Sequence, residues 1–196
     1  MTRLDGKVVA LVCRGSDGDR AIAVALAEAG ANLALGTVTP AEEFATASIA
    51  NEVWAIGHEQ FNIVLDAADP VAVASFAEEV CERLGRCDGL VIATGPVASV
   101  DFDELSRDEW NDLVSQHLTA VVVAVQAFAR VIERGGGGKV ALIVDPPAPT
   151  NVAGEAIGAA ARSFAQQLSS IWKDRPLVCT AFDRGDSPEE IVNALG

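Results

Sequence analysis

The sequence predicts a single α/β domain: a doubly wound parallel β-sheet of strand order 3-2-1-4-5-6, with helices on both faces. Short apolar runs alternate with longer amphipathic segments along the whole chain, which is typical of repeated strand–helix units. The first such unit joins two apolar strands through a glycine-containing turn and a helix within about thirty residues. Right-handed crossovers, with one reversal of direction after the third strand, then give the predicted order.

The helix of this first unit is expected to begin within residues 17–20 and to end at Gly30. Ile22, Leu26 and Ala29 recur at the three-to-four spacing of a helix face that packs on a sheet. Glycine adopts a left-handed conformation easily, so Gly30 is a natural C-terminal stop.

The later elements follow from the same patterns, and no repeat or low-complexity segment interrupts them, so residues 1–196 are expected to form one domain. Apolar runs of strand length predict strands at residues 7–12, 32–36, 60–65, 88–93, 139–144 and 177–182. Apolar residues at helical spacing, some preceded by proline or followed by acidic residues, predict further helices at residues 40–53, 71–84, 107–134, 152–172 and 188–195.

Composition narrows the class of protein. Half of the residues are apolar, 21% are charged, and 14 basic against 28 acidic residues give a net charge of −14, which argues against nucleic acid or an anionic membrane as a partner. We expect a cytoplasmic protein because no signal-like segment or uninterrupted apolar run of about 18 residues is present. The four cysteines lack CxxC spacing and are expected to be buried, reduced thiols, with no metal site.

Several segments together resemble the short-chain dehydrogenase/reductase (SDR) family over nearly the whole chain. The resemblance implies a Rossmann-type fold, NAD(P)-dependent oxidoreductase chemistry and oligomer formation. It also implies that Asp66 would hydrogen-bond an adenine, although Asp66 could instead cap the helix that begins near Pro70. The segments are RAIA (20–23), LAEAGA (26–31), DAADP (66–70), LGRCDGLV (84–91), DEW (108–110) and LT (118–119).

The coenzyme-binding turn departs from the family pattern. The family's T-G-x-x-x-G-x-G falls on residues 12–19, where an ungapped alignment replaces the three glycines by Cys13, Asp17 and Asp19. A one-residue deletion recovers only Gly18. The glycines matter because they let backbone N–H groups approach a diphosphate at the N-terminus of a helix.

An acidic side chain would compete with that diphosphate. Asp17 or Asp19 would place a carboxylate in its position and act as an N-cap, and Arg14 and Arg20 could offset part of the repulsion. The acidic residue expected to bind the ribose is replaced by Thr37. We therefore expect no bound cofactor. If NAD(P) does bind, the candidate residues are Arg14, Gly15, Ser16, Gly18, Asp66 and Gly95.

The catalytic pair of the family is missing. The resemblance places the family's acid/base Tyr at Ile157 and its Lys at Ala161, and the chain contains no tyrosine. Arg162 is one residue further on, about 100° around the helix, and its high pKa does not suit proton transfer. The family's catalytic Ser region is replaced by the segment that begins at Asp145, and its helix Asn falls on His117. Standard hydride chemistry is therefore not expected.

His117 and Asp145 are the weak catalytic candidates that remain. Both are expected at the carboxyl ends of the strands, where a His–Asp pair could act as a general base and its orienting group. His117 could equally be a hydrogen-bonded helix residue, and no nucleophile accompanies it. Only eleven residues follow Gly185, so the family's substrate lobe is expected to be truncated.

Helices 107–134 and 152–172 are expected to lie at an interface between subunits. Each has more apolar residues than a single face packed on the sheet would need, so a second face is expected to be covered by a partner. In the family, the corresponding helices pack against those of a neighbouring subunit. We expect a homo-oligomer or a complex with an active SDR relative. The residues that support this are Val114, Leu118, Val121, Val122, Val125 and Phe128 in the first helix, and Ala156, Ala160, Phe164, Leu168, Ile171 and Trp172 in the second.

The leading hypothesis is thus a catalytically inactive SDR-like protein that acts as a structural or regulatory subunit of a dehydrogenase oligomer. One alternative is an atypical NAD(P)-dependent oxidoreductase that uses His117 and Asp145. Another is a non-catalytic protein that binds a small molecule in the same crevice.

Overall fold

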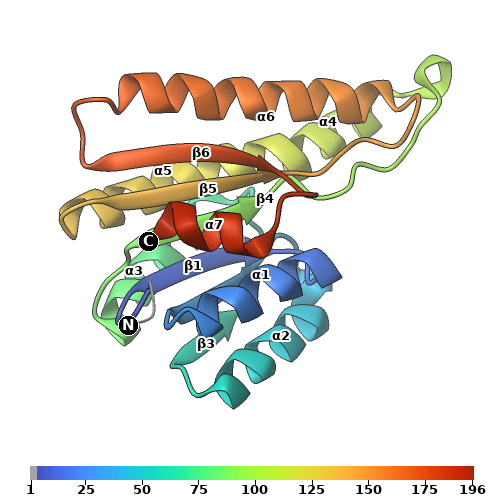
Figure 1. Cartoon of the computed structure of the whole chain (residues 1–196). Coiled ribbons are helices and arrows are strands. Elements are labelled where there is room, and N and C mark those ends of the chain that lie inside the picture. Colours follow the sequence, from blue (N-terminus) through green and yellow to red (C-terminus); the bar gives the residue numbers. More distant parts are fainter. Residues whose placement is uncertain (1–3) are drawn as a thin grey trace.

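Six parallel strands form the centre of the structure, a computed structural model that describes residues 4–196. The strand order is β3-β2-β1-β4-β5-β6, which confirms the order predicted from the sequence (Figure 1). The strands are β1 (Val8–Cys13), β2 (Asn32–Thr37), β3 (Gln60–Ile63), β4 (Gly89–Ala93), β5 (Gly138–Val144) and β6 (Leu177–Asp183).

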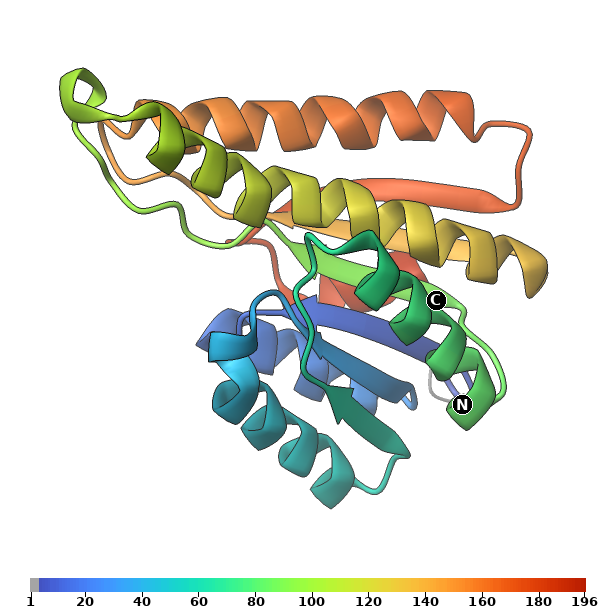
Figure 2. The same cartoon turned by 180° about the vertical axis from the view of Figure 1, so that it is seen from behind.

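Helices cover both faces of this sheet, as Figures 1 and 2 show from opposite sides. One face is covered by α1 (Asp17–Glu28), α2 (Glu43–Ile56) and α7 (Pro188–Leu195). The other face is covered by α3 (Pro70–Leu84), α5 (Ala120–Arg134) and α6 (Val152–Ile171). The remaining helical pieces are η1 (Pro40–Glu42), η2 (Phe102–Glu104), α4 (Arg107–Val114) and the π-helical turn η3 (Ser115–Thr119).

The central strand β1 explains why its sequence is apolar throughout. Val8, Ala10 and Val12 point towards the α3–α5–α6 face, and Val9 and Leu11 point towards the α1–α2–α7 face. Side chains alternate along a strand, so a strand with helices on both sides must be apolar at every position. Such a strand cannot show the alternation of a half-exposed sheet.

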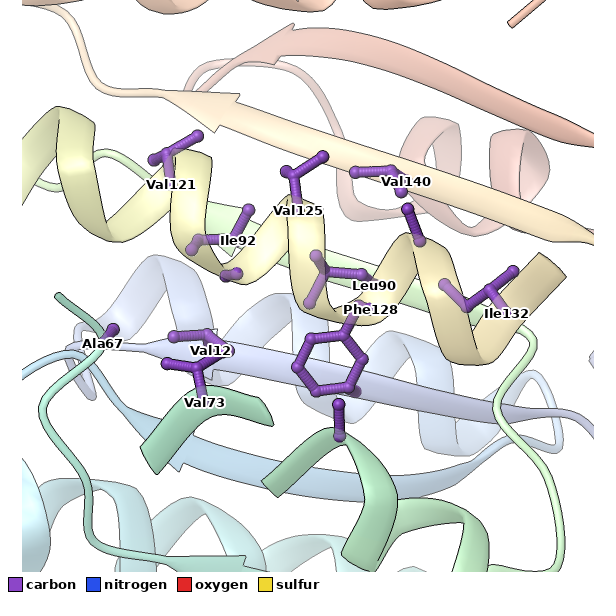
Figure 3. Packing of buried hydrophobic residues seen from close by; sticks show 14 of the residues in the cluster. Val12, Ala67, Val73, Leu90, Ile92, Val121, Val125, Phe128, Ile132 and Val140 are labelled. Carbon is purple, nitrogen blue, oxygen red and sulfur yellow. The ribbon is translucent and has the colours of Figure 1, made fainter. Parts of the chain in front are cut away.

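Aromatic packing between helices fixes the α3–α5 layer. Figure 3 shows the Phe128 ring of α5 near the sheet residue Leu90 and on the side of α5 that faces α3. Phe128 and Phe76 of α3 are both fully buried, with ring centroids 5.4 Å apart and planes at 75°. This edge-to-face arrangement is a preferred geometry for aromatic pairs.

The helix predicted over residues 107–134 is interrupted by η3, where the chain makes a π-type turn between α4 and α5. By length and composition alone this stretch could cross a membrane. Its apolar residues Val121, Val125 and Phe128 are, however, buried in the core (Figure 3). These three side chains therefore belong to the side of the helix that covers the sheet, and the predicted interface would have to use other residues of the helix.

Strand β6 lies at the edge of the sheet and, within residues 4–196, pairs only with β5. Two polar groups from neighbouring segments bond to its backbone. The Ser169 hydroxyl of α6 donates to the Cys179 carbonyl, and the Asp183 N–H donates to the Asp186 carboxylate at 2.8 Å.

Candidate functional site

The carboxyl ends of β1, β4, β5 and β6 lie at the same edge of the sheet, where open α/β sheets bind their ligands. Charged side chains from different segments form two groups there: Arg14 pairs with Glu42, and Arg184 pairs with Asp19 and Asp145. We call these residues the crevice network: Arg14, Asp19, Glu42, Asp145 and Arg184.

The turn after β1 is closed by its own side chains. The Ser16 hydroxyl caps α1 by accepting the Asp19 N–H at 3.1 Å. The Asp19 carboxylate in return accepts the N–H groups of Ser16 (3.2 Å) and Arg14 (3.1 Å). Sequence analysis named Asp17 or Asp19 as the N-cap, which is wrong: Ser16 is the N-cap, Asp19 completes the capping box, and Asp17 is exposed.

Arg184 follows β6 and links this turn to β5. Its Nη1 donates to Asp19 Oδ1 at 2.9 Å, while its Nε and Nη2 donate to the two oxygens of Asp145 at 2.9 and 3.0 Å. Burial opposes the charge of Arg184, but the carboxylates of Asp145 and Asp19 outweigh it and raise the pKa of the guanidinium. A bidentate pair of this kind is both strong and geometrically specific.

Sequence analysis missed Arg184, although a signal was present. Arg184 comes directly after β6, as Asp145 comes directly after β5. Because the two strands are parallel neighbours, both residues had to lie at the same edge of the sheet.

Arg14 fills the space between β1 and the π turn. Its Nη1 donates to Glu42 Oε1 at 3.0 Å, and its Nη2 donates to the Gln116 carbonyl at 2.9 Å. Its Nε is buried and has no hydrogen-bond partner among the described residues. The other arginine expected at this turn, Arg20, instead forms an ion pair with Glu52 of α2 and is not part of the crevice network.

His117 and Asp145 lie in the same region but do not form the expected pair. His117 Nδ1 lies 2.7 Å from the Thr94 carbonyl, so this nitrogen carries the proton and donates it. Both Asp145 oxygens are bonded to Arg184, and Oδ2 also accepts the Gly95 N–H at 3.0 Å. The group that orients His117 is therefore the Thr94 carbonyl.

The charge state of His117 follows from its surroundings. Burial lowers its pKa, the hydrogen bond to Thr94 opposes this shift, and the positive charge of Arg14 lowers the pKa further. A π-type turn, which often occurs at functional sites, carries this histidine. The imidazole is thus neutral near pH 7, with Nδ1 as its donor.

Two of the candidate coenzyme-binding glycines are approached by the chain's own arginines. A Cβ atom at Gly18 would lie 2.9 Å from Cδ of Arg184, and one at Gly95 would lie 2.1 Å from Nε of Arg14. Gly95 also has a positive φ of 78°. In dinucleotide-binding turns, glycines give this close approach to a diphosphate. Here the side chains of Arg184 and Arg14 occupy the space beside Gly18 and Gly95 instead.

The other candidate residues also have internal roles. Gly15 has a φ of +75° and packs against α2, where an added Cβ would lie 2.3 Å from Cβ of Ala45. Asp66 accepts the Ala68 N–H at 2.9 Å within its own turn. The alternative that Asp66 caps the following helix is wrong, because the N-cap of α3 is Asp69.

The position expected to meet a ribose is closed as well. The Thr37 side chain is buried, and its hydroxyl donates to the Leu65 carbonyl at 2.6 Å and accepts the Leu65 N–H at 2.8 Å. Together with the filled turn and the two covered glycines, this means that the residues present do not fit a dinucleotide in this conformation.

The two positions that the family resemblance assigned to its Tyr and Lys hold side chains that cannot transfer a proton. Ile157 and Ala161 of α6 are both buried. Arg162 is exposed and donates to Asp183 at 2.5 Å. At the end of β1, burial and the negative charge of Asp19 raise the pKa of the Cys13 thiol to about 12, so Cys13 is not a nucleophile.

Comparison with known proteins decides the family. Residues 8–174 match the short chain dehydrogenase family. The chain belongs to this family. It is 32% identical over 137 residues to D-threitol dehydrogenase of Mycolicibacterium smegmatis, covering 69% of this chain and 51% of that protein. It is 30% identical over 196 residues to the 3-oxoacyl-acyl-carrier-protein reductase of Salmonella typhimurium, covering 97% of this chain and 78% of that protein.

Solved structures agree with this SDR fold. A short-chain type dehydrogenase/reductase from Mycobacterium marinum matches with a TM-score of 0.86 at 19% identity, covering 97% of this chain and 86% of that one. Carveol dehydrogenase from Mycobacterium avium in complex with NAD matches with a TM-score of 0.82 at 22% identity, covering 92% and 71%. At this identity, these two matches establish the fold alone.

Proposed function

We propose that this SDR protein does not transfer hydride and acts as a structural or regulatory subunit of a dehydrogenase oligomer. One observation carries this proposal: the two helix positions that the family uses for its acid/base Tyr and Lys hold Ile157 and Ala161, and both are buried. No tyrosine occurs in the sequence to replace the missing donor. Without a positioned proton donor, carbonyl reduction lacks general acid catalysis.

An exposed apolar surface supports the role as a subunit. In the part of the chain that the structure describes, residues 4–196, every residue of helix α4 is at least partly exposed. A groove of about 450 Å³ lies between the start of α4 and the start of α6, where Phe102 (64% exposed), Trp110 (36%) and Val152 (52%) line it. Figures 1 and 2 both show this part of the chain at the far end of the molecule. Contiguous exposed apolar residues often mark protein-binding surfaces.

A second, separate groove lies further along α5 and α6. Its volume is about 270 Å³, and its lining includes Phe164, Leu168 and Trp172. The two grooves accompany the helices at residues 107–134 and 152–171, which we propose as the interface with a second copy or with an active SDR relative. Because Val121 and Phe128 are used in the core, the contact would be made by the residues that line the grooves and by α4.

The two other hypotheses have less support. An oxidoreductase that uses His117 and Asp145 requires their carboxylate–imidazole pair, but Asp145 is bonded to Arg184. A small-molecule site in the crevice requires space that Arg14 and Arg184 occupy. Neither a membrane nor a nucleic acid partner is proposed, since the net charge is −14.

The catalytic part is tested by an absorbance assay of the wild-type chain with NAD(H) and NADP(H) against a panel of secondary alcohols and ketones. The expected result is no turnover above the rate without protein. Any protein-dependent, saturable change in reduced nicotinamide would overturn the inactive assignment.

The subunit part is tested by light scattering and native mass spectrometry of the wild type, alone and mixed with an active SDR relative. We expect a dimer or larger species in one of these samples. Trp110→Asp should dissociate it, whereas Trp54→Asp, a tryptophan that is 70% exposed on α2, should not. A wild type that stays monomeric in both samples would contradict this part.

A further inference from the structure

We propose that the chain carries an internal substitute for coenzyme phosphates: the Asp19 carboxylate occupies the anion position at the N-terminus of α1, and Arg184 and Arg14 close the crevice over it. This inference rests on the proposed non-catalytic function and deepens it, because it states why the fold does not need a dinucleotide.

The Asp19 carboxylate has the contacts that such sites give to a phosphate. Backbone N–H groups at the start of a helix, together with the helix dipole, favour a negative charge. Here Oδ2 accepts the N–H groups of Arg14 and of the N-cap Ser16, which directly precede α1, and Oδ1 accepts Nη1 of Arg184 at 2.9 Å. Asp19 is 1% exposed, so its carboxylate is shielded from solvent and a second anion could not use the same contacts without displacing it.

The glycines of the crevice support the same conclusion from a separate observation. Gly18 and Gly95 allow the aliphatic and Nε atoms of Arg184 and Arg14 to come within distances that a Cβ would prevent. A dinucleotide that used these glycines would have to displace both guanidinium groups. Displacing Arg184 would break its bonds to Asp19 and Asp145.

Arg184 also joins segments that are far apart in the sequence. Asp19 and Arg184 are 165 positions apart in sequence, and Asp145 ties the same guanidinium to the end of β5 and the Gly95 N–H. A buried charge that loses its partner is strongly destabilising. The network should therefore hold the crevice closed in the absence of any ligand.

The test uses Asp19→Gly, which removes the internal carboxylate and leaves the N–H groups of Arg14 and Ser16 and Nη1 of Arg184 without their acceptor, while Arg184 keeps its bonds to Asp145. Asp17→Gly is the matched control, because it makes the same change in the same helical turn at an exposed residue. Thermal unfolding of both variants and of the wild type is followed with inorganic pyrophosphate, ADP-ribose or NADH, against sodium chloride of equal ionic strength.

Asp19→Gly should lower the Tm by about 10 °C. Saturating pyrophosphate should restore at least about 5 °C of this loss, because a ligand stabilises only the state that binds it. The wild type and Asp17→Gly should show no saturable shift. An Asp19→Gly protein that folds but gains no anion-dependent shift would overturn the proposal.

A second measurement needs no variant. Titration of the wild type with NADH, followed by nicotinamide fluorescence and calorimetry, should show no saturable binding up to millimolar concentrations. Saturable binding at lower concentration would overturn the internal substitute, even if Asp19→Gly fails to fold. If such binding occurred without turnover, the non-catalytic role would still stand, whereas turnover would refute both proposals.

Discussion

The layer between the sheet and helices α3 and α5 differs from the crevice at the carboxyl edge in how its contacts are made. In the layer, uncharged side chains such as Phe76, Phe128 and Leu90 pack together without any hydrogen bond. In the crevice, arginines and carboxylates meet with defined donors and acceptors, and each guanidinium serves more than one partner.

The difference shows how a family can keep its fold while its site changes. Apolar packing tolerates many substitutions of similar volume, so the SDR framework is retained at about 30% identity. A binding site depends on a few groups in fixed positions. In this chain, the crevice differs from the family's glycine-rich pattern by a few charged side chains, among them Asp19 and Arg184.

The largest effect that separates the two regions is expected from Phe128→Ala. Removal of this buried ring should lower the free energy of unfolding by about 4 kcal/mol, through lost burial and a cavity beside Phe76. Urea unfolding at low and high salt measures it, and the loss should not depend on salt. The matched control is Phe44→Ala, since Phe44 is 88% exposed. If Phe128→Ala and Phe44→Ala lowered the free energy of unfolding by similar amounts, the packing between the sheet, α3 and α5 would not be the main source of stability.

A smaller effect on the free energy of unfolding is expected when the pH is changed, because His117 is a titratable group of the crevice. Burial and Arg14 lower its folded-state pKa below the ordinary 6.5, so between these two pKa values the unfolded chain binds more protons. Stability is therefore highest above the unfolded pKa of about 6.5 and is lost as the pH falls from there through the lower, folded-state pKa. Each unit of lowering corresponds to about 1.4 kcal/mol.

His117→Gln tests this expectation, because the free energy of unfolding of the variant should depend less on pH below about 7 than that of the wild type. An NMR titration of the His117 ring gives the pKa directly. A value at or above 6.5 would contradict the charge state assigned to the crevice.

The smallest effect is expected from Arg20→Ala. Arg20 pairs with Glu52 on the surface of the α1–α2 layer, and both side chains are substantially exposed. Exposed ion pairs contribute about 0.5 kcal/mol or less, so urea unfolding should hardly change. If Arg20→Ala were as destabilising as Asp19→Gly, the distinction between crevice and surface charges would fail.

The fold could be predicted from the sequence because its signals are local. Apolar runs placed the strands within a few residues, and helical spacing placed the helices that cover them. The π turn at Ser115–Thr119 was missed, since its residues continue the helical pattern on both sides. Periodicity also could not show which apolar residues of this helix, such as Val121 and Val125, are covered within the chain itself.

The candidate site was only partly predictable. The missing Tyr and the altered turn were visible in the sequence, and so was the presence of an acidic side chain near the start of α1. The partner of that side chain was not, because Arg184 is 165 positions away. The hydrogen bond between His117 and Thr94 likewise depends on how far the π turn rotates the histidine, which no spacing rule gives.

The edge of β6 that does not pair with β5 has a consequence for solubility. Exposed strand edges invite other chains to add strands, which leads to aggregation. Ser169 and Asp186 engage the backbone at Cys179 and Asp183, so an incoming strand would find these two ladder positions already taken. Replacing both by alanine would offer a longer template to neighbouring molecules, even though neither residue lies near the crevice.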